Sequence, residues 1–229
     1  MLSFLLPSFP RSNTASQHPL YTDAGGSFTE FLPPKHDHDS FCLRQTFLKE
    51  KMAKLRASEG HSVISPLYHW HLNQVEYFYV EKGSMIMKID EKEHVVTAKS
   101  GIIEVKPGVY HNFDIDPNSE EDLVFVVCGE PEDGLTEKFF RNFFGYLEDC
   151  SQNNITPSPF QLWLFLYNTE TFVALPRLPR FLGKWVSRWI YGYVGGKIIG
   201  EKILGLQDSY PEYYMKKDVV DSSYEKKLM

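Results

Sequence analysis

Short apolar runs alternate with polar residues through the middle of the chain. Side chains in a strand point alternately to its two faces, so this pattern predicts strands with one buried face. The runs are rich in β-branched and aromatic residues and are separated by turn-forming pairs such as Ser100-Gly101. We expect strands over residues 41–47, 54–57, 75–80, 84–90, 94–98, 102–106 and 123–128. Many short, evenly spaced strands favour a β-sandwich or barrel.

The period of the pattern changes after the last of these strands. Phe139, Phe143 and Leu147 lie on one face at helical spacing, which predicts a helix over 135–149. Further helices are expected over 160–174 and 181–205. The chain therefore divides into an N-terminal arm (1–40), a β-barrel (41–130), a helical extension (131–209) and a flexible tail (210–229).

The most specific chemistry lies in the segment HWHLNQVEYFYVEKG, residues 69–83. His69 and His71 are two apart and share one face of a strand. Glu76 follows at an odd offset, which requires the chain to turn at residues 72–74 if the carboxylate is to join the imidazoles. Glu76 then starts a strand with Phe78 and Val80 on its inward side and Tyr77 and Tyr79 facing away.

A second segment, GIIEVKPGVYH, supplies His111. Three imidazoles and one carboxylate can surround a single divalent metal ion, and this donor set suits Fe(II), Mn, Ni, Cu(II) or Zn. The neighbouring strands should place Met85, Met87, Ile89, Ile103 and Val105 inward. The predicted site is thus a polar metal centre near one mouth of an apolar interior, which suits a small, mostly apolar ligand.

These two segments resemble the motifs of the cupin superfamily, G-x5-H-x-H-x3,4-E-x6-G and G-x5-P-x-G-x2-H-x3-N. The match to the first runs from His69 to Gly83, with Val63 at the position of the leading glycine. The second is altered: Lys106 stands at the proline position and Ile115 at the final asparagine. The resemblance implies an antiparallel jelly-roll barrel over about 41–130 and a metal held by His69, His71, Glu76 and His111.

The chain is also similar to small cupins of fungal secondary metabolism. That resemblance implies an enzyme that oxygenates, dehydrates, isomerises or cyclises a lipophilic or aromatic, polyketide-type molecule. Glu76 would act as both ligand and base, and Tyr110 is expected to take part in catalysis as a hydrogen-bond donor. The alternative is a non-catalytic cupin that binds a metal or a small ligand and contacts a partner or a membrane through its C-terminal helices.

Charged residues are distributed unevenly along the chain. The net charge of −6 argues against nucleic acid as a partner. Residues 176–205, however, carry six basic side chains against Glu201 alone. Gly192, Gly196 and Gly200 form a stripe in this region, beside Trp185 and Trp189. One interpretation is a pair of soluble helices packed on the barrel or on a second protomer, as in a homodimer. The other is peripheral membrane contact through 181–205.

The remaining signals concern the compartment. Three cysteines without a C-x-x-C pair indicate reduced thiols and a cytoplasmic protein. The apolar start of the chain lacks a basic region before it and contains Pro7 and Pro10, so it makes a poor signal peptide. His36-Asp37-His38-Asp39 could form a second metal site, although a solvated turn is the simpler interpretation.

Overall fold

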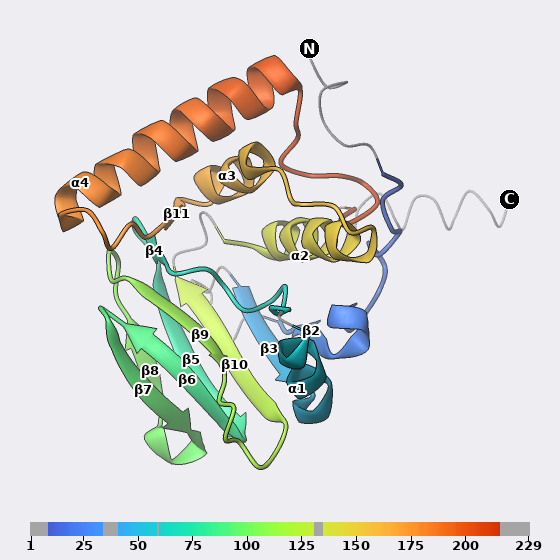
Figure 1. Cartoon of the computed structure of the whole chain (residues 1–229), viewed down its shortest axis with the longest axis vertical. Coiled ribbons are helices and arrows are strands. Elements are labelled where there is room, and N and C mark those ends of the chain that lie inside the picture. Colours follow the sequence, from blue (N-terminus) through green and yellow to red (C-terminus); the bar gives the residue numbers. More distant parts are fainter. Residues whose placement is uncertain (1–8, 34–40, 59, 131–134, 216–229) are drawn as a thin grey trace, which may run out of the picture.

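Two antiparallel β-sheets pack face to face, and the C-terminal helices cover one end of them (Figure 1). The computed structural model describes residues 9–33, 41–58, 60–130 and 135–215. The first sheet, in spatial order, contains β1 (Leu20–Thr22), β2 (Ser27–Phe31), β3 (Phe41–Phe47), β10 (Leu123–Glu130), β5 (Val75–Lys82) and β8 (Ile103–Val105). The second contains β11 (Thr171–Val173), β4 (His69–His71), β9 (His111–Ile115), β6 (Ser84–Ile89) and β7 (Lys92–Thr97). This confirms the predicted cupin-type fold with a helical extension.

The alternation of side chains along the strands places the core between the sheets. Phe78, Val80, Met85 and Met87 are all fully buried, as the sequence pattern predicts. Tyr79, which lies between two inward residues of β5, is 43% exposed. Each large apolar side chain buried in this way contributes about 1.5–3 kcal/mol to folding.

Two segments differ from the sequence-based prediction. Residues 54–57 lie in the helix α1 (Lys49–Ala57), not in a strand. Its sequence KEKMAKLRA consists of good helix formers, and propensity prevailed over the short apolar pattern. Part of the predicted arm also joins the first sheet, where β1 pairs with β2 and β2 with β3.

The helices lie in layers over one end of the sandwich (Figure 1). They are α2 (Glu137–Gln152), α3 (Pro159–Asn168), α4 (Arg180–Trp185) and η4 (Val186–Leu204), preceded by the short turns η2 (Asp23–Gly25) and η3 (Ala98–Ser100). Val186 has right-handed helical geometry, so α4 continues into η4 as one long helix. The helix predicted over 160–174 ends at Asn168, and Thr171–Val173 forms β11 instead.

The glycine stripe of the long helix faces α3. Its hydrogen bonding is of the π type, i→i+5, which keeps residues four to five apart on one face. A Cβ atom on Gly196 would lie 2.7 Å from the backbone of Trp163 and Leu164. The stripe therefore packs inside the protein, against α3. Within the part of the chain that the structure describes, no helix is long and apolar enough to span a membrane.

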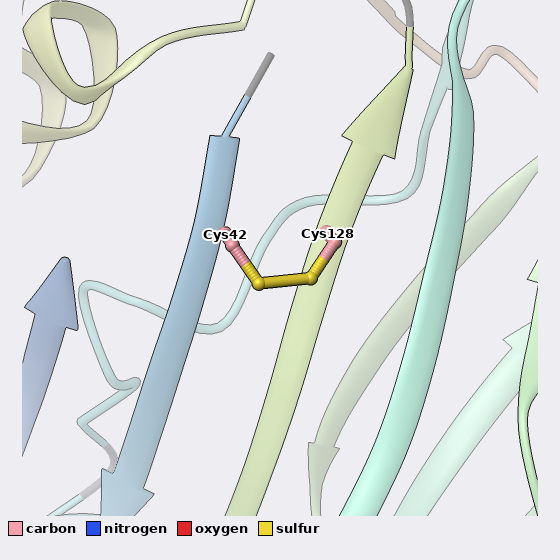
Figure 2. Close-up of a disulfide and its surroundings, with 2 residues drawn as sticks. All are labelled: Cys42 and Cys128. Atoms are coloured by element: carbon pink, nitrogen blue, oxygen red, sulfur yellow. A yellow bond between two sulfur atoms is a disulfide. The ribbon is translucent and has the colours of Figure 1, made fainter. Parts of the chain in front are cut away.

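The cysteines and the start of the tail depart from expectation. Cys42 on β3 and Cys128 on β10 lie directly opposite each other and form a disulfide (Figure 2), so the prediction of reduced thiols was wrong for this pair. Cys150 is buried and free. Tyr210 and Tyr213 are also buried, so the tail is packed at least to Tyr213. The segment His36–Asp39 lies outside the described residues.

Candidate metal centre

The four predicted ligands come together between the two sheets. His69 and His71 project from β4, and His69 is paired in register with His111 on β9. Two bends at Leu72 and Asn73 carry the chain from the second sheet to the first, where Glu76 lies on β5. The turn that the sequence required is therefore present. The three imidazoles come from one sheet and the carboxylate comes from the other.

The ligand atoms are close enough to share one ion. Nε2 of His111 lies 2.9 Å from Oε2 of Glu76, and Nε2 of His71 lies 3.3 Å from the same oxygen. Nε2 of His69 lies 3.1 Å from Nε2 of His71. One ligand atom from each of the four residues lies within 4.8 Å of all the others.

The outer nitrogens of the rings fix which nitrogen carries the proton. Nδ1 of His69 lies 2.7 Å from the carbonyl oxygen of Leu67, and Nδ1 of His111 lies 3.1 Å from that of Val109. Because a carbonyl oxygen only accepts, both Nδ1 atoms must donate. A metal ion bound between the rings would take the inward Nε2 atoms as its ligands, in place of the hydrogen bond between Nε2 of His111 and Oε2 of Glu76.

His71 is oriented by a side chain of the helical extension. Its Nδ1 lies 3.0 Å from Oγ1 of Thr171 on β11. That strand pairs with β4, with Thr171 opposite His71 and Val173 opposite His69. No sequence pattern indicates this contact, because the periodicity over 160–174 predicts a helix where β11 lies.

Burial and mutual charge set the protonation states. Burial lowers the pKa of His69 well below its usual value, and the neighbouring His111 and His71 lower it further. Burial by itself would raise the pKa of Glu76, but His71 and the hydrogen bond with His111 outweigh it and hold the pKa well below the usual range. A neutral imidazole beside an ionised carboxylate is the state that a divalent cation needs. The residues therefore fit a metal ion.

The ligands open into a cavity of about 90 Å³. Its walls are mainly apolar and come from β3, β10, the segment 63–67 and the phenylalanines of α2. His69, His71 and Glu76 lie in the wall together with Phe139, Phe140 and Phe143. The sequence predicted an apolar pocket but placed methionines beneath the metal. Those methionines lie in the core, and α2 supplies the aromatic wall instead.

Tyr110 is not among the residues that line the cavity, and its catalytic role stays a prediction. It precedes His111 directly, and neighbouring residues of a strand point to opposite faces. Tyr110 belongs to a separate cluster with Trp70 and Phe172. Its hydroxyl donates to the carbonyl oxygen of Arg180 at 3.4 Å.

Two antiparallel sheets with three inward histidines and one glutamate at the cupin motif positions give this chain a cupin-like fold and a cupin-like site. Across 218 residues it is 35% identical to the probable oxidoreductase virH of Hypocrea virens, covering 92% of this chain and 93% of that protein. The chain belongs to the family of this fungal oxidoreductase.

Two further relatives carry related names. The oxidoreductase iacF of Pestalotiopsis fici is 31% identical over 79% of this chain and 87% of its own. The epoxidase atD of Aspergillus terreus is 31% identical over 76% of this chain and 59% of its own. No protein-family model matches the chain.

The likeness to solved structures is distant. A predicted oxalate decarboxylase of Thermotoga maritima is 17% identical over 46% of this chain and 80% of its own, with a TM-score of 0.35. The fold assignment therefore rests on the sheets and the motif residues.

Proposed function

We propose that this chain is a metal-dependent oxidoreductase that oxidises a small, largely apolar metabolite of a fungal secondary pathway. The observation that carries the proposal is the His69, His71, Glu76 and His111 cluster, which opens directly into an apolar cavity. The names of the relatives, oxidoreductase and epoxidase, support oxidation over other reaction types. A lipophilic or aromatic, polyketide-type substrate suits a wall made of phenylalanine and leucine.

The four ligands would hold Fe(II), Mn, Ni, Cu(II) or Zn, and dioxygen would be the oxidant. A redox-active ion held by these residues would supply the redox chemistry through which dioxygen oxidises the substrate, with the substrate as the net electron donor. The protein itself would orient the substrate and exclude water, because the phenylalanines of α2 hold the substrate against the cluster. Glu76 lies in the cavity wall and would serve both as a metal ligand and as the base that accepts a proton from the substrate, since the adjacent histidines keep its carboxylate ionised.

The experiment is dioxygen uptake by the full-length chain loaded anaerobically with Fe(II), Mn(II) or Cu(II), with a panel of aromatic and alkene-containing polyketides. Mass spectrometry under ¹⁸O₂ would follow the products. Incorporation of ¹⁸O that is lost in His111→Ala supports the proposal.

Two other outcomes would replace it. A redox-neutral product would favour dehydration, isomerisation or cyclisation by the metal as a Lewis acid. Tightly bound zinc without turnover would favour the non-catalytic binding cupin.

We also propose that the outer face of the long helix rests on a membrane surface. Opposite its glycine stripe, the helix exposes large apolar side chains in two adjacent rows with a spacing of four to five residues. They are Phe181, Trp185, Trp189 and Tyr193 in one row and Ile190, Val194, Ile198 and Ile203 in the other. Phe181 is 79% exposed and Trp185 is 53% exposed. Arg177 and Arg188, within residues 176–205, carry positive charge that complements anionic lipid headgroups, and tryptophan favours the bilayer interface.

Co-sedimentation with vesicles tests this proposal. The full-length chain should bind vesicles that contain phosphatidylserine at least tenfold better than vesicles of phosphatidylcholine alone. The double variant Trp185→Ser, Trp189→Ser should lose this binding. Ile102→Ser removes a side chain that is 69% exposed elsewhere on the surface and should leave it unchanged. If the double variant instead converts a homodimer to a monomer, the helix face is a protein interface and the membrane proposal is wrong.

A further inference from the structure

Gln45 places a buried amide in the otherwise largely apolar wall of the cavity. It lies on β3, is 2% exposed, and lines the same cavity as His69, His71 and Glu76. Its Nε2 donates to Oγ1 of Thr29 at 3.4 Å. Its Oε1 is buried and has no hydrogen-bond partner among the residues that the structure describes. A buried polar atom without a partner is unfavourable, so this oxygen calls for a donor.

The conclusion does not depend on the orientation of the amide. The hydroxyl of Thr29 can donate or accept, so it can pair with either end of the Gln45 amide. Each orientation leaves one polar amide atom without a partner in the cavity wall. A hydroxyl group can donate to a free oxygen or accept from a free NH₂, and it satisfies Gln45 in both cases.

Gln45 lies away from the metal ligands. On β10, Glu76 is opposite Gly129 whereas Gln45 is opposite Phe125. The two residues are thus four residues apart along the strands and two strands apart across the sheet. On a flat sheet this corresponds to roughly 17 Å between the Cα atoms, a distance that the inward-pointing side chains shorten. A group held by Gln45 is therefore not a group held at the metal.

We propose that Gln45 is a specificity-determining residue that binds a hydroxyl group of the substrate remote from the atom that is oxidised. The inference rests on the proposed function only in that the cavity takes the substrate. It assigns the substrate class: a small molecule with an apolar body and a hydroxyl at the end opposite the reacting position. Leu43, on the same face of β3, contacts the apolar body.

The probes that test this proposal are phenol and toluene. Phenol carries a hydroxyl group where toluene carries a methyl group. Binding of each to the full-length chain is measured by calorimetry in oxygen-free buffer, so no turnover is required. The wild-type chain should bind phenol at least tenfold tighter than toluene. Gln45→Met keeps the size of the side chain but removes the amide, and it should reduce this preference to less than threefold.

Two controls separate the amide from other causes. Gln45→Glu retains an acceptor and should retain the preference. Thr46→Val alters the opposite face of β3, away from the cavity, and should also retain it.

Three results would overturn the inference. The first is equal binding of both probes by the wild-type chain, and the second is binding of neither at millimolar concentration. The third is a phenol preference that persists in Gln45→Met, which would place the hydroxyl on the metal or on water. None of these affects the dioxygen assay, so failure here is distinguishable from failure of the oxidoreductase proposal.

Discussion

Thr171 Oγ1 lies 3.0 Å from Nδ1 of His71, although the two residues are 100 positions apart in the sequence. The contact joins the helical extension to the candidate metal centre, because Thr171 belongs to β11 and β11 pairs with β4. The neighbouring Thr169 hydroxyl lies 3.3 Å from the same Oγ1. The orientation of one ligand therefore depends on a segment outside the two-motif barrel.

Replacing Thr171 by Val should weaken metal binding without removing a ligand. Valine keeps the shape of the side chain but cannot accept from Nδ1 of His71, so the ring loses its fixed orientation. Loss of such a partner typically costs 10–100-fold in metal affinity. Competition with a chromophoric chelator measures the effect. Thr171→Ser retains the hydroxyl and should bind metal as the wild-type chain does; equal affinity in all three proteins would contradict the assigned role.

Removing a ligand should have a larger effect than removing the nearby tyrosine. We expect His69→Ala and His111→Ala each to lower the metal content of the purified protein at least tenfold, because each deletes one of four donors. Elemental analysis gives the result directly. Tyr110→Phe is the matched control: it alters the residue adjacent to His111, but its ring lies on the other face of the strand. Full metal retention in both alanine variants would refute the ligand set.

The stability of the metal-free protein should fall as the pH is lowered from 7.5 to 5. The folded chain holds the pKa of His69 well below its usual value of 6.5, whereas the unfolded chain does not. Below pH 6.5, His69 therefore binds a proton in the unfolded state but stays neutral in the folded state, which favours unfolding. The contribution of neutral His69 to the free energy of unfolding is complete above pH 6.5. It is lost as the pH falls towards the pKa that His69 has in the folded chain.

Thermal denaturation across this pH range tests that prediction. Glu76 also makes the folded chain less stable as the pH falls, but at lower pH. Its pKa is held below 4.5, so its contribution to stability is lost only under more acidic conditions. His69→Gln should flatten the dependence between pH 6.5 and 5. His94→Gln removes an exposed histidine on β7 and should not. An unchanged slope in His69→Gln would show that another group is responsible.

Gly196→Ala should destabilise the protein even though alanine is the better helix former. On an open helix this change would add about 1 kcal/mol of stability. Here the new Cβ would meet the backbone of α3 at 2.7 Å, and such overpacking typically costs 1–3 kcal/mol. Chemical denaturation should therefore show a net loss. Val194→Ala on the exposed face of the same helix should change little; a gain in Gly196→Ala would mean that the two helices separate easily.

The candidate site was largely predictable because its signals are local. The spacing of His69 and His71 follows from the strand period, and the odd offset of Glu76 required the turn that the structure contains. His111 was found through the second motif. Inward and outward positions on β5 and β6 followed from simple alternation.

What the sequence did not reveal depends on contacts between distant segments. Thr171 was assigned to a helix because three residues are too few to carry a strand period of their own. Tyr110 was selected for its position beside His111, and the same alternation that places His111 inward turns it away. Gln45 stood in an expected strand, but only the apolar surroundings give its amide significance. Cys42 and Cys128 have no spacing signal, and their pairing arises from the register of β3 with β10.

The division of the ligands between the two sheets gives a bound ion a mechanical role. Three donors are anchored in one layer and the fourth in the other, so the ion would connect the two sheets near the end that the helices cover. Any ion that binds only the folded state stabilises it by mass action, by about 2.7 kcal/mol at a free concentration one hundred times Kd. Binding of the metal ion should therefore slow the separation of the two sheets during unfolding, in addition to preparing the site for the reaction.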